Sequence, residues 1–324
     1  MYKLLPLSCA VCVLSALSTV GMAQQPFPIR PVRLITPYEP GGSTTIVSRL
    51  MGAKLTEIWG QSVIVDNRPG GNTVIGTQAA VRANPDGYTL LFATTTFAIN
   101  HLTVRSLPYD SLKDLAPLAN IYYNETILAI HPSIPANTLA ELIAYAKSRP
   151  GGLNNGASGI GGFAQIRSEM FRILTGADIK NISYKGTGPA VTALLGGHVQ
   201  LAFVPPIATV PYINSGKLKG LAVTGTQRVR ALPQVPTFAE AGLPAYNASS
   251  WNGVLVPAST SRPLIQRISN DIAKVLSAPE LREKMSSQGA EPGYAGPEEF
   301  TKMIKDDIAR YARVIKEANI QMAT

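Results

Sequence analysis

The sequence predicts an α/β protein built around two sheets. From residue 31 onward, short β-rich runs alternate with helical patterns, which is typical of α/β architecture. The chain has 324 residues, which at roughly 150 residues per domain suggests about two domains, each large enough for a core. Hydrophobic residues make up 45% and charged residues 15% of the chain, which excludes a disordered or fibrous protein.

The first part of the chain predicts a β-α-β-α-β unit. Strands are expected at 32–36, 62–65 and 88–92, separated by helices at 43–59 and 74–82. Folds of this doubly wound kind bind ligands at the carboxyl edge of the sheet, where strands run into helices.

The middle of the chain predicts a second unit built in the same way. A small-residue segment at 154–158 runs into one of its helices. The expected strands are 127–130, 182–184, 199–204 and 218–223, and the expected helices are 139–147, 162–174 and 189–195.

Two amphipathic helices are expected near the C-terminus. Pro263 stands where a first-turn proline belongs, and apolar side chains follow from Ile265 at spacings of 3, 4 and 3. From Phe300 to Ile315, apolar side chains repeat at 4, 4, 3 and 4, with charged residues between them. Each helix is predicted to cover a sheet.

The first 23 residues have the features of a cleaved secretory signal. Lys3 precedes an apolar stretch at 4–20, and small residues follow at Gly21 and Ala23. A membrane anchor is the alternative, but Pro6 and several serines interrupt a stretch that falls short of the ~20 apolar residues a span needs. Both cysteines lie in this segment, so a disulfide scaffold is excluded for the mature chain. The formal charge of +9 becomes +8, with 28 basic and 20 acidic residues.

A Pro-Gly-Gly segment at 40–42 lies between the first strand and its helix. Glycines let the backbone approach a ligand, and a helix N-terminus with unpaired N–H groups favours an anion. The alternative is an ordinary N-cap, although no Glu or Gln stands three residues on to complete a capping box. The candidate ligand-binding residues here are Tyr38, Gly41, Gly42, Ser43, Thr44 and Thr45.

A second small-residue loop precedes the helix at 162–174. It formally fits the dinucleotide pattern G-x-G-x-x-A, but Asp178, the acidic residue at the required distance, precedes the next strand instead of ending it. A second helix N-terminus that faces the same ligand is the favoured interpretation. The candidates are Ser158, Gly159, Gly161 and Gly162.

Three threonines, Thr94, Thr95 and Thr96, follow the strand at 88–92 and would place hydroxyls at the same edge. The alternative is that they are simply β-forming residues at the exit of a strand.

The sequence gives little support to catalysis, metal binding or nucleic-acid binding. The three histidines, His101, His131 and His198, lie far apart, and neither a metal-binding spacing nor a G-x-S-x-G motif occurs. Lysine and arginine are dispersed along the chain. No enzymatic activity, cofactor, metal or nucleic-acid partner is therefore predicted.

The mature chain, from Pro31 to about Ile320, resembles the Bug (TctC-like) family of periplasmic solute-binding proteins of tripartite tricarboxylate transporters. Many separate blocks in the same order make the resemblance specific. They are 38–42, 65–70, 84–91, 107–110, 138–142, 184–190, 194–197, 235–237, 240–242 and 250–253.

The resemblance implies a two-lobed type II periplasmic binding protein, or Venus flytrap, in which each lobe is a central sheet flanked by helices. Residues 24–124 plus 248–324 would form lobe 1 and residues 125–247 would form lobe 2. A small organic carboxylate would be held between the lobes by the two glycine-rich loops, partly through waters.

The chain departs from the family pattern at several positions. Members usually carry Asp where this chain has Thr45, and Ser where it has Gly162. Shortly after that Ser they carry a His, where this chain has Ala164 and Gln165, and they often have Phe-Asp where this chain reads Phe203-Val204. Val204 is therefore a further candidate. An acidic group in the site pairs with a ligand ammonium, so its loss favours a carboxylate ligand without an amino group. Such a ligand would carry more than one acid group or an apolar body.

The resemblance implies a periplasmic receptor, expected as a monomer, that hands its ligand to membrane subunits of a tripartite tricarboxylate-type transporter or presents it to a sensor protein. Two alternatives remain open. One is an exported enzyme acting on organic acids, and the other is a signalling or interaction protein with altered or lost ligand binding.

Overall fold

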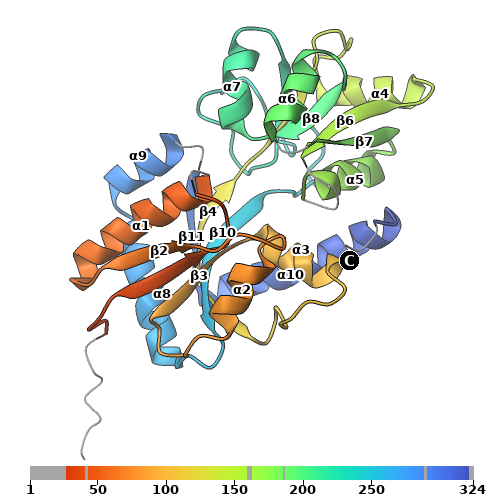
Figure 1. The fold of residues 1–324 in the computed structure, drawn as a ribbon. Helices are drawn as coiled ribbons and strands as arrows, with labels where there is room; N and C mark the ends of the chain where they lie inside the picture. Colours follow the sequence, from red (N-terminus) through yellow and green to blue (C-terminus); the bar gives the residue numbers. More distant parts are fainter. Residues whose placement is uncertain (1–26, 41–42, 159–162, 185–186, 288–289, 321–324) are drawn as a thin grey trace, which may run out of the picture.

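The computed structural model describes residues 27–40, 43–158, 163–184, 187–287 and 290–320. Within these residues the chain forms two sheets flanked by helices, and Figure 1 shows them in two separate parts of the molecule. The predicted α/β, two-lobed fold class is confirmed. The predicted signal segment, 1–23, lies outside the described residues.

The six-stranded sheet takes its strands from both ends of the chain. Its order is β11-β4-β10-β3-β1-β2. The parallel strands are β1 (Val32–Thr36), β2 (Val63–Asn67) and β3 (Thr89–Thr94), and the antiparallel ones are β4 (Leu115–Asn124), β10 (Ser250–Pro257) and β11 (Glu291–Ala295).

The five-stranded sheet is built from the middle of the chain, in the order β7-β6-β8-β5-β9. β6 pairs in parallel with β7 and β8, whereas β5 pairs antiparallel with β8 and β9. The strands are β5 (Ile127–Ile130), β6 (Leu153–Ser158), β7 (Ile179–Tyr184), β8 (Leu201–Val204) and β9 (Lys219–Val223).

All of the expected helices form, and three others join them among the described residues. The unexpected helices are α3, α7 and α9; α3 begins in threonines and α7 contains Pro211, so neither has a strong helical pattern. The helices are α1 (Ser43–Trp59), α2 (Val74–Val81), α3 (Thr95–Thr103), α4 (Leu139–Ser148), α5 (Phe163–Thr175), α6 (Thr187–Leu195), α7 (Pro206–Asn214), α8 (Arg262–Leu276), α9 (Pro279–Ser287) and α10 (Pro297–Glu317).

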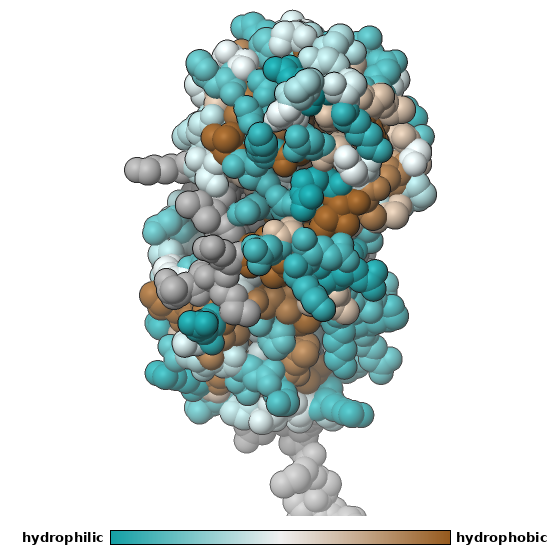
Figure 2. Space-filling view, turned by 90° about the vertical axis from the view of Figure 1, so that its right-hand side faces the viewer, coloured by the Kyte–Doolittle hydropathy of each residue, from teal (hydrophilic) through white to brown (hydrophobic). Residues whose placement is uncertain are grey.

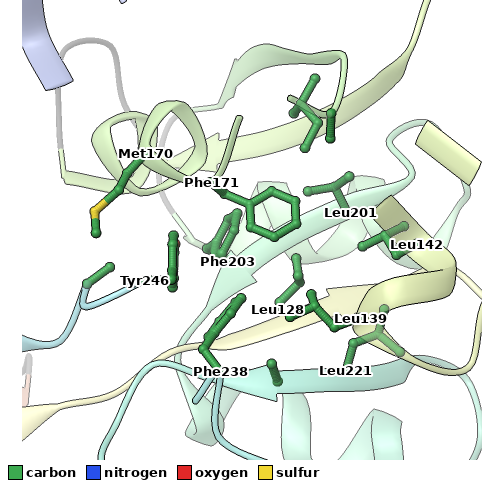
Figure 3. Packing of buried hydrophobic residues seen from close by; sticks show 14 of the residues in the cluster. Leu128, Leu139, Leu142, Met170, Phe171, Leu201, Phe203, Leu221, Phe238 and Tyr246 are labelled. Carbon is green, nitrogen blue, oxygen red and sulfur yellow. The ribbon is translucent and has the colours of Figure 1, made fainter. Parts of the chain in front are cut away.

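An aromatic cluster forms the centre of the five-stranded part. Phe171 of α5 and Phe203 of β8 pack edge to face with their ring centroids 5.9 Å apart. Phe238 and Tyr246 complete the cluster at a centroid distance of 4.1 Å, and Figure 3 shows the four rings together beside Leu128, Leu201 and Leu221 of the sheet. Because each ring buries a large apolar area, this cluster contributes strongly to the stability of this part.

β10 approaches its neighbours closely at Gly253. A Cβ at this position would lie 2.4 Å from the Phe300 ring and 2.6 Å from the Ala119 carbonyl oxygen. Glycine is therefore required for the contact between β10 and α10. Next to it, the rings of Trp251 and Phe300 pack edge to face at 5.0 Å.

The long helix α10 packs against both parts of the molecule. Phe300 and Ile304 belong to a core cluster of the six-stranded part, whereas Tyr311 and Val314 belong to the cluster around the five-stranded sheet. The Tyr311 ring contacts that of Phe163 on α5 at 5.4 Å. Figure 2 views this face, and its apolar surface gathers where the two parts meet.

No helix in the described part of the chain is both long and apolar enough to cross a membrane.

Candidate functional site

Three helices begin at one edge of the six-stranded sheet. Because β1, β2 and β3 are parallel, their carboxyl ends meet there, and each leads into the next helix, α1, α2 or α3. The first N–H groups of a helix lack partners within it and carry partial positive charge. This edge therefore has the local electrostatics of an anion site.

Hydrogen bonds join the ends of these strands through uncharged side chains. The Tyr38 hydroxyl and the Thr94 hydroxyl oxygen are 2.6 Å apart, which links the loop after β1 to the end of β3. At the end of β2, the Asn67 amide donates at 2.9 Å both to the Tyr38 carbonyl and to the Thr45 hydroxyl. Thr45 in turn donates to the Glu39 carbonyl at 3.2 Å.

The three threonines after β3 have different positions. Thr94 is the N-cap of α3 and accepts from the Thr96 N–H at 3.2 Å. Thr95 is fully buried and accepts from the backbone N–H of Trp251 at 3.1 Å, which ties α3 to β10. Thr94 and Thr96 remain partly exposed at this edge, whereas Thr95 serves the scaffold.

Burial raises the pKa of Tyr38, and hydrogen bonding to Thr94 and Thr96 offsets part of this effect. The phenol is therefore neutral at pH 7, and its hydroxyl can both donate and accept. A neutral phenol does not repel an approaching anion.

The candidates of the first glycine loop are only partly described. Thr44 is partly exposed in the first turn of α1, whereas Thr45 is 1% exposed and its hydroxyl is bonded within the loop. Thr45 therefore positions the loop after β1. Ser43 opens α1, and Gly41 and Gly42 lie outside the described residues.

The second loop begins at the corresponding edge of the five-stranded sheet. β6 ends at Ser158, in register with Tyr184 at the end of the parallel strand β7, and α5 follows from Phe163. The candidates Gly159, Gly161 and Gly162 lie outside the described residues.

Val204 does not lie in an open position. Its side chain is 2% exposed and packs in an apolar cluster with Val191 and Leu194 of α6. The structure thus places this candidate in the core, because its register on β8 turns the side chain toward α6.

A polar cluster that sequence reasoning missed lies where the chain crosses between the two sheets. Glu125 stands between β4 and β5, and its carboxylate accepts from the hydroxyls of Thr224 and Ser249, both at 2.7 Å. Burial raises the pKa of Glu125, and these two hydrogen bonds oppose the shift. No sequence signal marks the cluster, because its partners are 99 and 124 residues away from Glu125.

The groups at this edge of the sheet are suited to holding an anion. No group of three or more His, Cys, Asp or Glu side chains suited to a metal ion occurs among the residues that the structure describes. What converges instead is a set of neutral hydroxyl and amide groups beside helix N-termini, an arrangement that stabilises a small anion through hydrogen bonds.

Comparison with known proteins agrees with this architecture. The profile of the family described as "Tripartite tricarboxylate transporter family receptor" (TctC) matches residues 47–320. The chain is 36% identical to protein BugT of Bordetella pertussis over 312 residues, which covers 94% of this chain and 96% of that protein.

Two solved structures with ligands are also similar. Rpa4515 of R. palustris, solved with adipate, is 33% identical and has a TM-score of 0.76, covering 92% of this chain and 100% of that one. MatC of Rhodopseudomonas palustris, solved with bound malate, is 27% identical with a TM-score of 0.71, covering 89% and 100%. Fold, family profile and relatives agree, and the chain belongs to the TctC family of solute-binding receptors.

Proposed function

We propose that this protein is a periplasmic receptor that captures a small organic carboxylate between its two sheets. The observation that carries this proposal is the convergence of Tyr38, Thr94 and Thr96 beside the N-terminus of α3. Neutral hydroxyls and helix N–H groups bind an anion without a second buried charge. The adipate and malate held by the two similar proteins of known structure support the same ligand class.

The ligand would lie between two lobes, 24–124 plus 248–324 and 125–247. Two chain crossings, near Glu125 and Ser249, support hinge motion at this boundary. A receptor with micromolar affinity has a binding free energy of about −8 kcal/mol. Several hydrogen bonds to a charged group, at about 1.5–3 kcal/mol each, account for an affinity of this order.

The receptor would act outside the cytoplasm. The signal-like segment 1–23 supports export, and the family supports a partnership with the membrane subunits of a tripartite tricarboxylate-type transporter. The net charge of +8 on the mature chain would favour anionic ligands at long range.

The ligand would lack an amino group. Thr45 is neutral and buried, and Val204 is apolar and buried, so neither position supplies a carboxylate to pair with a ligand ammonium. Malate and aspartate form a matched pair for this question, because they differ at one carbon by a hydroxyl in place of an ammonium group.

Calorimetric titration of the mature protein with adipate, malate, aspartate and glutamate tests the proposal. We expect binding of at least one of the first two, with malate tighter than aspartate. Tighter binding of aspartate would show that the ligand class is wrong. Absence of binding and of any thermal shift would favour an interaction protein, and turnover of a bound acid would favour an enzyme.

A further inference from the structure

A buried arginine lies next to the hinge. Arg167, in the second turn of α5, is 7% exposed. Its Nε donates to the Ala248 carbonyl at 3.0 Å, on the segment that returns the chain to β10. Its guanidinium carbon lies 3.9 Å from the centroid of the Phe163 ring.

The Arg167 charge has no ion-pair partner among the described residues. Two phenols, Tyr246 and Tyr311, and the carboxylate of Glu125 act on it, but Glu125 accepts its hydrogen bonds from Thr224 and Ser249. Burial lowers the pKa of Arg167, which reflects the loss of water around its charge. Burying a guanidinium without an ion-pair partner is unfavourable, because its charge loses hydration that no nearby carboxylate replaces in direct contact.

The guanidinium lies at the N-terminal end of α5. Side chains on a helix lean toward its N-terminus, and the contact with Phe163, the first residue of α5, shows that Arg167 follows this direction. The positive end of the helix dipole and a full positive charge therefore coincide at the beginning of α5. Helix α5 also packs on α10, so this point lies on the side that faces the six-stranded part.

We propose that Arg167 is a ligand-binding residue whose counter-ion is a carboxylate of the captured solute. This inference rests on the proposed function and deepens it. The neutral groups around Tyr38 and Thr94 would hold one end of the ligand, and Arg167 would require a negative charge on the part of the ligand that meets α5. Its two Nη groups match the two oxygens of a carboxylate, which a lysine ammonium does not reproduce.

Titration of wild type, Arg167→Gln and Arg167→Lys with adipate and with its monoamide tests the assignment. The two probes differ by one carboxylate charge. We expect wild type to bind adipate at least about tenfold more tightly than the monoamide. Arg167→Gln should lose at least about tenfold in adipate affinity and should bind adipate and the monoamide equally well. Arg167→Lys should recover part of both.

Arg172→Gln is the matched control. Arg172 lies on the same helix, but its side chain is 37% exposed and is paired with Glu169 at 2.7 Å. We expect its adipate affinity to equal that of wild type. In the ligand-free protein, Arg167→Gln should keep the wild-type melting temperature, because it removes a buried charge that lacks a counter-ion.

The outcomes separate this inference from the proposed function. If wild type binds adipate or malate and Arg167→Gln binds it equally well, the assignment of Arg167 is overturned while the receptor function stands. If wild type binds neither acid, both fail. Glu125→Gln tests whether Glu125, and not the ligand, is the counter-ion of Arg167. If Glu125→Gln loses as much adipate affinity as Arg167→Gln, and the double variant loses no more, Glu125 is the counter-ion and the inference is overturned.

Discussion

Thr45 illustrates how one hydroxyl organises the loop after β1. It donates to Glu39 and accepts from Asn67, so it joins the first turn of α1 to the end of β2. The side chain is 1% exposed, and water cannot easily replace either partner. Position 45 thus controls the shape of the candidate site by joining the loop after β1 to the end of β2.

Replacing this hydroxyl should destabilise the protein. Thr45→Val keeps the shape but leaves the Glu39 carbonyl and the Asn67 amide each short of one partner. We expect the free energy of unfolding to fall by about 1–2 kcal/mol. Thr45→Ser, which keeps the hydroxyl, should lose less than about 1 kcal/mol in urea unfolding. Equal losses in the two variants would contradict a role for the hydroxyl.

Asp307 should make stability depend on pH. Its carboxylate accepts from the Trp251 indole at 2.8 Å and pairs with Arg310, with Tyr311 and Asp306 nearby. Burial raises the pKa of Asp307 from 3.8 to about 6, and Arg310 opposes part of the shift.

The sign follows from proton binding. The folded protein holds the Asp307 proton more tightly than the unfolded chain does, so its contribution to stability is largest below about pH 4 and falls as pH rises to about 6. Over this range the contribution of Asp307 to the free energy of unfolding falls by about 3 kcal/mol. Urea unfolding of wild type and Asp307→Asn from pH 3.5 to 7.5 measures it as a change in the difference between the two proteins. A difference that is constant across this range would contradict the prediction.

At the scale of elements, α10 departs most from expectation. Its regular apolar spacing predicts a helix that covers one sheet, and the helix forms from Pro297 to Glu317. Its N-terminal half packs on the six-stranded part, whereas Tyr311 and Val314 pack against the five-stranded part. α10 therefore joins the two parts outside the chain crossings.

Removing the Tyr311 ring should weaken this junction. Tyr311 is fully buried and contacts Phe163, so Tyr311→Ala should lower the free energy of unfolding by about 3–5 kcal/mol. Tyr311→Phe, which loses the hydrogen bond from Arg310, should lose about 1 kcal/mol. Arg313→Ala, exposed on the same helix, serves as control and should stay within about 0.5 kcal/mol of wild type. Equal losses in the Ala and Phe variants would contradict a packing role for the ring.

In the molecule as a whole, the chain crosses between the two parts near Glu125 and Ser249, and a hydrogen bond joins these two residues. Gly225 leaves room for the Glu125 carboxylate, because a Cβ there would lie 2.8 Å from its carboxyl carbon. The arrangement connects both crossing segments to the end of β9 through hydrogen bonds.

Gly225→Ala should displace the Glu125 carboxylate from at least one of its hydroxyl donors. We expect a loss of about 1–3 kcal/mol in the free energy of unfolding, measured by chemical denaturation. The same substitution should be nearly neutral in a Glu125→Ala background, since the clash and the hydrogen bonds are then absent. Equal effects in both backgrounds would show that Gly225 acts independently of Glu125.

Much of the fold was predictable because its signals are local. The expected strands at 32–36 and 127–130 are confirmed with the same bounds, and the helix at 43–59 likewise. Strands β4, β10 and β11 were not expected, since antiparallel partners as distant as Leu115 and Pro257 leave no local mark. The segment at 154–158 proved to belong to β6, because pairing on both sides compensates for its low β-propensity.

The α/β class, the order of the main elements, the glycine and hydroxyl loops between strands and helices, and the family were all predictable from the amino-acid sequence. These depend on residue type and short-range spacing. The folded structure was needed to show that Thr45 and Thr95 are buried and bonded within the scaffold, and that Val204 is in the core. It was also needed to show that Glu125 and Arg167 lie at the crossings. These partners are distant in the sequence, since Thr95 and Trp251 are 156 residues apart, Glu125 and Ser249 are 124 apart, and Arg167 and Ala248 are 81 apart. They meet only when both sheets have formed, so a local pattern cannot indicate them.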